Sequence, residues 1–145
     1  MHSKMVAHSG GSRTFVLVLA PGEEAFATLT DFAKREKIGG ASLTAIGALE
    51  SATVGWFDWA KKAYRRIDIS AQCEVLSGLG DIARDDHDEA SVHMHVVLGM
   101  SDGSTRGGHL LAGLVRPTLE VMLVETPAHL HRRKRPELGI SLIDI

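Results

Sequence analysis

The segment VHMHVVLGMSDGSTRGGHLLAGLVRPTLEVMLVE, residues 92–125, decides the fold that we predict for this chain. Its apolar and β-branched residues form three runs, namely Val92–Met100, Gly108–Val115 and Thr118–Glu125. Runs of this length and composition are typical of strands. The turn residues Ser101–Ser104 separate the first two runs, and Arg116-Pro117 separates the last two. The segment therefore predicts three strands, of which the first two can close into an antiparallel hairpin.

The remainder of the chain adds further strands and one helix. Five strand candidates precede the deciding segment: Thr14–Leu19, Ala41–Gly47, Val54–Trp59, Ala63–Ile69 and Glu74–Leu79. We expect Ala48–Ala52 to be a short link and Asp81–Ala90 to be a mobile acidic loop. After Pro21-Gly22 the apolar residues recur at three and four positions, which indicates a helix that ends at Gly39-Gly40. One helix and about eight strands predict an α+β sheet domain.

The size and composition favour one ordinary domain. The chain has 145 residues, of which 44% are hydrophobic, and a formal net charge of −2. We expect residues 1–12 to form a flexible arm and residues 13–145 to form a single domain. No apolar run approaches the ~18–20 residues of a membrane helix, and the polar Met1–Arg13 segment does not resemble a secretory signal. A cytoplasmic location follows as the default expectation.

The single cysteine limits the metal chemistry. Cys73 has no second cysteine to pair with, so an intrachain disulfide and a thiolate-rich zinc site are both excluded. Histidines and carboxylates remain as metal ligands. The near-neutral net charge also provides no global field that would concentrate a polyanion at the surface.

Three histidines of the deciding segment form the main candidate site. In His93-Met94-His95 the two imidazoles lie two residues apart, so on a strand they project to the same face. His109 follows Gly107-Gly108 and comes near the pair if the Asp102-Gly103 turn closes the hairpin. Neutral imidazole binds transition metals, and three such ligands suit zinc with one open position. The alternative is three ordinary histidines that are hydrogen-bonded in a half-buried sheet.

Two other features are weaker candidates. Glu120 interrupts an apolar strand, and a buried carboxylate needs a partner. It could ligate or orient the metal, act as a general base, or pair with an arginine. His129 and His131 would also face one way on a strand, but they precede a basic run that would repel a cation.

The basic run near the C-terminus is the one candidate for contacts with nucleic acid. It consists of Arg132, Arg133, Lys134 and Arg135. Such a run can contact phosphates, although a solvated surface segment is the favoured interpretation.

Several of these motifs together resemble the plant and prokaryote conserved (PPC) domain family. The resemblance rests on Gly107–Val115 with Thr118–Val121, on His93–Val96, on Glu74–Gly78, and on the early Pro21-Gly22-Glu23 turn. It extends roughly from Arg13 to Leu142. The combination of His-x-His with Gly-Gly-His is its most specific element.

The resemblance implies a fold, an assembly and a metal. Members have a strongly bent, mainly antiparallel sheet with one main helix, and they usually form homotrimers. Some prokaryotic members carry a metal on the histidines that correspond to His93, His95 and His109. Plant members are attached to AT-hook motifs that bind DNA, whereas this sequence contains only the superficially similar Arg133-Lys134-Arg135-Pro136. Asp81 stands where the family more often has Asn.

Two functions follow from these observations. The first is a homotrimer that binds a transition metal through three histidines and holds a small ligand or performs a weak metal-assisted reaction, with a binding role favoured over catalysis. The second is a non-enzymatic DNA-binding or regulatory protein that acts through the basic C-terminal run.

Overall fold

The computed structural model describes residues 1–145 and is built mainly from strands. The elements are β1 (His2–Ser9), β2 (Ser12–Leu19), α1 (Ala25–Arg35), β3 (Gly40–Asp58), β4 (Ala63–Ile69), β5 (Cys73–Arg84), β6 (Ala90–Gly99), β7 (Thr105–Glu125), β8 (His131–Arg135) and β9 (Ile140–Asp144). The one helix has 11 residues, so the fold is mostly β and not clearly of the predicted α+β class. Only the bridge between Arg84 and His131 is parallel, which confirms the mainly antiparallel sheet. No helix is both long and apolar enough to cross a membrane.

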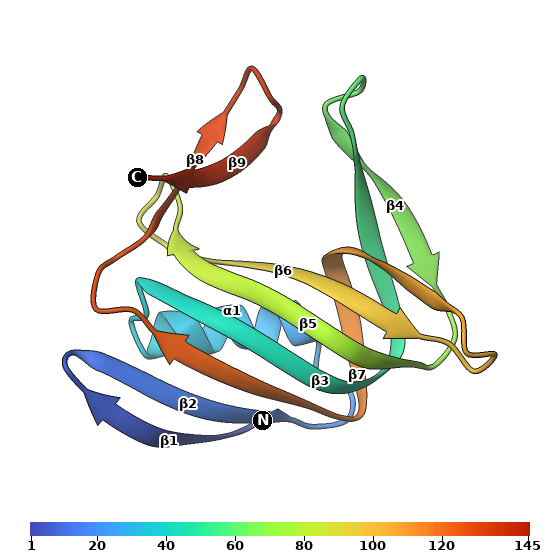
Figure 1. The fold of residues 1–145 in the computed structure, drawn as a ribbon, viewed down its shortest axis with the longest axis horizontal. Helices are drawn as coiled ribbons and strands as arrows, with labels where there is room; N and C mark the ends of the chain where they lie inside the picture. The colour runs from blue at the N-terminus through green and yellow to red at the C-terminus, as the bar shows by residue number, and fades with distance from the viewer.

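The sheet curves back on itself and closes a ring of paired strands (Figure 1). β3 pairs with β5, β5 with β6, β6 with β7, and β7 again with β3. Each of the long strands β3 and β7 takes part in two regions of pairing, because its two halves have different neighbours. The second half of β7 pairs with β2 and its first half with β6. This closure brings the first half of β7 beside the end of β6.

β3 and β7 bend together in the middle of their pairing. The register shifts between the pair Gly47 and Leu119 and the pair Leu49 and Val115, so β7 contains more residues than β3 at this point. Pro117 lies within this bulge, where its missing N–H cannot interrupt a ladder. Gly47 has φ of 143°, and a Cβ there would lie 2.3 Å from the Thr118 carbonyl oxygen. The bend therefore requires glycine.

The bend explains two errors of the sequence analysis. We expected Ala48–Ala52 to be a link between two strands and Arg116-Pro117 to separate two others. Both segments instead lie inside continuous strands of 19 and 21 residues. Bulges allow a long strand to change direction without ending, and their irregular sequences resemble those of turns.

The N-terminal segment also differs from the expected arm. Residues 2–9 form β1, which pairs antiparallel with β2 through a turn at Gly10 and Gly11. All eight residues of β1 are exposed. The strand therefore lacks the alternation of buried and exposed side chains by which a strand is recognised in a sequence. The strand is held by backbone pairing, which the sequence analysis had no means to detect.

Helix α1 covers one face of the sheet, behind β3 and β7 in Figure 1. The Glu24 carboxylate caps its N-terminus by accepting the Ala27 N–H at 2.6 Å. Leu29 and Phe32 are buried, and the Phe32 ring packs edge-on against Phe15 at 5.2 Å between centroids. Lys37, with φ of 57°, takes the left-handed position after the helix, not the expected Gly39-Gly40. The glycines instead allow close packing against the His129 and Ala128 segment.

We predict that Gly47→Ala destabilises the protein strongly. The added methyl group meets backbone atoms that cannot move aside, so we expect a loss of roughly 2–4 kcal/mol in the free energy of unfolding. Urea unfolding at one fixed protein concentration measures this loss. Gly103→Ala is the matched control, because Gly103 has φ of 81° but open space around it, and a loss of about 1–2 kcal/mol is expected there. Equal losses for the two variants would contradict the steric role of Gly47.

Candidate metal centre

The three histidines converge because of strand periodicity and one hairpin. On β6 the exposure alternates, so that Met94 is buried while His93 and His95 lie on the outer side. The predicted hairpin is confirmed, since β6 and β7 pair antiparallel with His95 directly opposite His109. Gly103, with φ of 81°, turns the chain between the two strands. All three imidazoles therefore meet on one side of the sheet.

The geometry of the cluster suits a single metal ion. One ring nitrogen from each of His93, His95 and His109 lies within 4.8 Å of the others. The ring centroids are 5.0–5.2 Å apart. Tetrahedral zinc with Zn–N of about 2.0–2.1 Å needs nitrogen atoms about 3.3 Å apart. Small rotations about the side-chain bonds close that difference.

The environment of His95 and His109 favours their neutral form. Burial lowers the pKa of His109 to about 4, and the nearby His93, His95 and Arg132 lower it in the same direction. Partial burial and the neighbouring His93 also lower the pKa of His95. A neutral imidazole keeps a free lone pair, which is the form that binds a metal.

Asp81 connects His93 to the C-terminal hairpin. Its Oδ2 lies 3.3 Å from His93 Nδ1, and its Oδ1 accepts a hydrogen bond from Arg132 Nη2. Burial acts to raise the pKa of Asp81, but the hydrogen bonds to His93 and Arg132 outweigh it and keep the pKa below its usual value. The contact with Nδ1 leaves His93 Nε2 for a metal. A carboxylate behind a ligating histidine orients the ring and raises its basicity.

His109 is packed by an aromatic ring and has an unpaired nitrogen. Tyr64 of β4 stacks on His109 with 4.7 Å between the ring centroids and an interplanar angle of 27°. The Nδ1 atom of His109 is buried and has no hydrogen-bond partner. An unsatisfied buried nitrogen is costly unless something binds it. The residues present therefore fit a metal ligated by three histidines.

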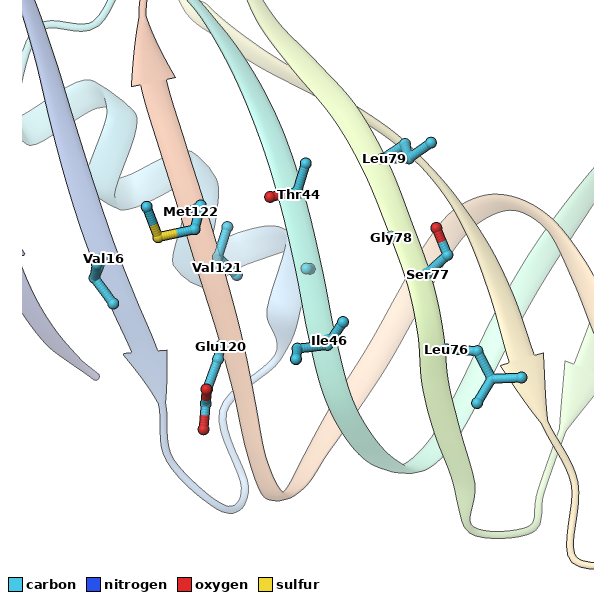
Figure 2. A pocket seen from close by; sticks show the side chains of 11 residues that line it. Val16, Thr44, Ile46, Leu76, Ser77, Gly78, Leu79, Glu120, Val121 and Met122 are labelled. Atoms are coloured by element: carbon cyan, nitrogen blue, oxygen red, sulfur yellow. The ribbon is translucent and has the colours of Figure 1, made fainter.

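Glu120 does not belong to this cluster. It is exposed on the outer face of β7, opposite Ile46 and Val18, and it lines a different hollow, which Figure 2 shows. The premise that this carboxylate is buried was wrong, because the strand alternates and Leu119 and Val121 are the buried neighbours. Asp81 holds the position beside the histidines that we had considered for Glu120.

The basic run is divided between the two faces of β8. Arg132 is buried with 8% exposure and pairs with Asp81. Arg133 and Arg135 both pair with Asp144, at 3.0 and 2.5 Å. The run is therefore not the freely solvated segment that the sequence suggested. Only Lys134 has a side chain without an ion pair.

Asp81 and Tyr64 were not predicted as site residues, and Arg132 was predicted only as a nucleic-acid contact. Asp81 was assigned to the start of an acidic loop, but β5 extends to Arg84 and places Asp81 directly opposite His93. The position of Asp81 could have been predicted from the sequence. Asp81 lies two residues after Leu79 and four after Ser77, so a strand that continues to Asp81 places all three side chains on one face. No local signal existed for Tyr64 and Arg132, which approach from strands distant in the sequence.

Comparison with known proteins gives the family. The profile of the Plants and Prokaryotes Conserved (PCC) domain matches residues 6–127. The chain therefore belongs to this family, which is the PPC family that its sequence resembles.

Solved structures of similar proteins share the fold. The chain is 31% identical to a plant- and prokaryote-conserved protein from Pyrococcus horikoshii, with a TM-score of 0.86 over 96% of this chain and 98% of that one. A protein from Archaeoglobus fulgidus, described as metal-containing, is 28% identical with a TM-score of 0.83 over 98% and 97% of the two chains. A candidate DNA-binding protein from Bacteroides thetaiotaomicron is 25% identical, with a TM-score of 0.85 over 95% and 94%.

A curated relative is much longer than this chain. The bifunctional protein GlmU of Synechococcus sp. (strain JA-3-3Ab) is 30% identical over 120 residues, which cover 81% of this chain. The matched residues make up only 18% of that protein. The chain thus spans about a fifth of the length of this relative.

We predict that the metal-free protein loses stability as the pH falls from about 6.5 to about 4. The pKa of His109 is about 4 in the folded protein and about 6.5 in an unfolded chain. In that pH window the unfolded state binds the proton and the folded state does not, so stability falls. Because His109 is only partly buried and solvent screens it, the expected loss is roughly 2–3 kcal/mol, somewhat below the full value for this difference in pKa. Below pH 4 both states are protonated and this contribution is fully lost.

Urea unfolding at several pH values measures this dependence. His109→Gln removes the titrating group, so its stability is expected to depend less on pH in the same window. An unchanged slope in the variant would show that His109 is not the group responsible.

Proposed function

We propose that this protein is a homo-oligomeric PPC-domain protein that binds one transition-metal ion per chain through His93, His95 and His109, and that its main role is ligand binding and not catalysis. One observation carries the proposal, namely the convergence of three imidazoles from two paired strands. The Asp81 carboxylate behind His93 supports it, because ligating histidines commonly have such a partner.

Zinc is the ion that we propose. Three nitrogen ligands and an open fourth position are the arrangement of many zinc sites, and imidazole suits zinc among the common metals. When bound, the ion would act as a Lewis acid toward a ligand at its open position. The Archaeoglobus fulgidus relative that is described as metal-containing supports the presence of a metal in this fold. The protein's own contribution is to hold three rings close together and to favour the neutral form of His95 and His109.

We predict that protein purified without chelators contains about one transition-metal ion per chain. The double variant His93→Ala, His109→Ala is expected to lose it, because one imidazole alone binds weakly. Asp81→Asn is expected to weaken zinc affinity by at least about tenfold, since the oriented carboxylate is lost. Elemental analysis and competition with a chromophoric chelator provide the measurements.

The control for this experiment is His87→Ala. His87 lies in the loop between β5 and β6 and is exposed, so its removal should leave the metal content unchanged. A wild-type protein that is empty and also fails to take up zinc would refute the proposed metal centre.

An exposed apolar face supports self-association. Across the outer side of β2, β7, β3 and β5, cross-strand pairing aligns Val16, Met122, Thr44 and Leu79 in one row. Ile46 is 61% exposed, and Leu79 is 60% exposed. Figure 2 shows these side chains spread over neighbouring strands. Contiguous apolar surface of this kind marks an interaction site.

The same row continues into the candidate metal centre. Leu79 lies opposite His95, which lies opposite His109. A second copy seated on the apolar face would therefore border the exposed His95. The family resemblance implies three copies, and we propose the homotrimer as the assembly in which this face is covered.

We predict that Ile46→Glu disrupts the oligomer. Ile46 lies opposite Glu120, so a second carboxylate there would repel the first and lose its hydration in a covered face. The variant is therefore expected to run as a monomer while the wild type runs as a trimer. Size-exclusion chromatography with light scattering measures the mass. Trp59→Glu is the control, because Trp59 is 66% exposed but lies just beyond the end of β3. A trimeric Ile46→Glu variant would place the interface elsewhere.

DNA binding through the basic run has less support. The description of the Bacteroides thetaiotaomicron relative as a candidate DNA-binding protein favours it. Against it, all three arginines of the run are held in ion pairs with Asp81 and Asp144. Phosphate contacts would have to compete with these pairs. The structure therefore favours a role for this hairpin within the protein.

A further inference from the structure

A cavity of about 300 Å³ is lined by His93 and His109 and lies between the β3–β4 hairpin and the β8–β9 hairpin. Both hairpins rise on the same side of the sheet in Figure 1. Their ends touch, because a Cβ at Gly139 would lie 2.7 Å from the Lys62 carbonyl oxygen. The two hairpins thus form an arch, and the cavity under it is of a size that suits a small molecule.

Strand β8 turns two cationic side chains into this cavity. Arg132 and Lys134 lie two residues apart and line it, whereas Arg133 and Arg135 point to the other face and pair with Asp144. Alternation along a strand produces this division. Ser141 of β9 pairs with Lys134 in the sheet and also lines the cavity.

Two cationic side chains of the cavity have donor groups without partners. Lys134 makes no ion pair, although Asp86 accepts a hydrogen bond from its backbone N–H. Arg132 donates from Nη2 to Asp81, whereas its Nε is buried without any hydrogen-bond partner. Tyr64, Ser91 and Ser141 add hydroxyl groups. No aspartate or glutamate is among the lining residues. Asp81 partly balances the charge of Arg132 from outside the cavity, and the side chain of Lys134 has no ion-pair partner.

We propose that this cavity binds a small oxyanion ligand, a carboxylate or a phosphate, whose charged oxygen atoms contact Lys134 and Arg132 beside the three-histidine centre. This inference deepens the proposed function by naming the ligand class, and it rests on that function for the role of the metal. A second cation would be repelled by Arg132 and Lys134. A purely apolar ligand would leave the unpaired donors unsatisfied, which costs free energy.

Amide NMR of the labelled protein tests this proposal. Inorganic phosphate and acetate are titrated separately into zinc-treated and metal-free protein at constant ionic strength. Saturable shifts are expected at the amides of Lys134 and Gly139–Ser141 with at least one of the two anions. The anion that binds more tightly assigns the ligand as a phosphate or a carboxylate.

Two variants locate the site. Lys134→Gln is expected to weaken binding by about tenfold or more, because a charged hydrogen bond is lost. Lys61→Gln makes the same change of charge on the β3–β4 turn, outside the lining residues, and should leave the affinity unchanged. Equal effects of the two variants would indicate only a general attraction of anions and would overturn the proposal.

The outcomes separate this inference from the metal centre. Saturable shifts in metal-free protein that takes up no zinc would support the anion site and refute the proposed metal function. Zinc uptake without saturable shifts for either anion would support the metal centre and overturn the anion site. Absence of both would overturn both proposals.

Discussion

At Gly47 the backbone of β3 passes so close to the Thr118 carbonyl that no side chain fits between them. This contact lets β3 and β7 bend together, so that one half of β7 pairs with β2 and the other half with β6. The ring of strands closes only because of that change of neighbours. The β6–β7 hairpin itself sets His109 opposite His95, and the bent, closed sheet brings Tyr64 of β4 and Asp81 of β5 to this hairpin. The surroundings of the candidate centre thus depend on a steric constraint located elsewhere in the sheet.

Around the histidines, one carboxylate organises groups from three strands. Asp81 of β5 contacts His93 of β6 and pairs with Arg132 of β8. A buried arginine without this partner would be strongly unfavourable, and the pair therefore holds the C-terminal hairpin against the sheet. Burial is the main cause of the low pKa of His109, and the nearby Arg132 acts in the same direction. Packing of the hairpin and the chemistry of the site are coupled through a single side chain.

The alternation of side chains along the strands explains two features of the surface. On the outer face of the sheet, a largely apolar row leads through the exposed Leu79 to His95. On β8, alternation directs Lys134 into the cavity, while Arg133 remains in ion pairs. The charge of the basic run alone suggests DNA binding. The direction of its side chains on β8 suggests instead a site for a small anion.

Local patterns in the sequence determined the features that depend only on residues close together in the chain. The period of two placed His93 and His95 on one face, and the Asp102-Gly103 turn made His109 a third member, since a short hairpin fixes its own register. Tertiary structure alone decided the rest. The continuity of β3 and β7 through their bulges, the exposure of Glu120, and the approach of Arg132 to Asp81 all depend on pairing between distant segments. Such pairing follows from how the whole sheet closes, and no local pattern encodes it.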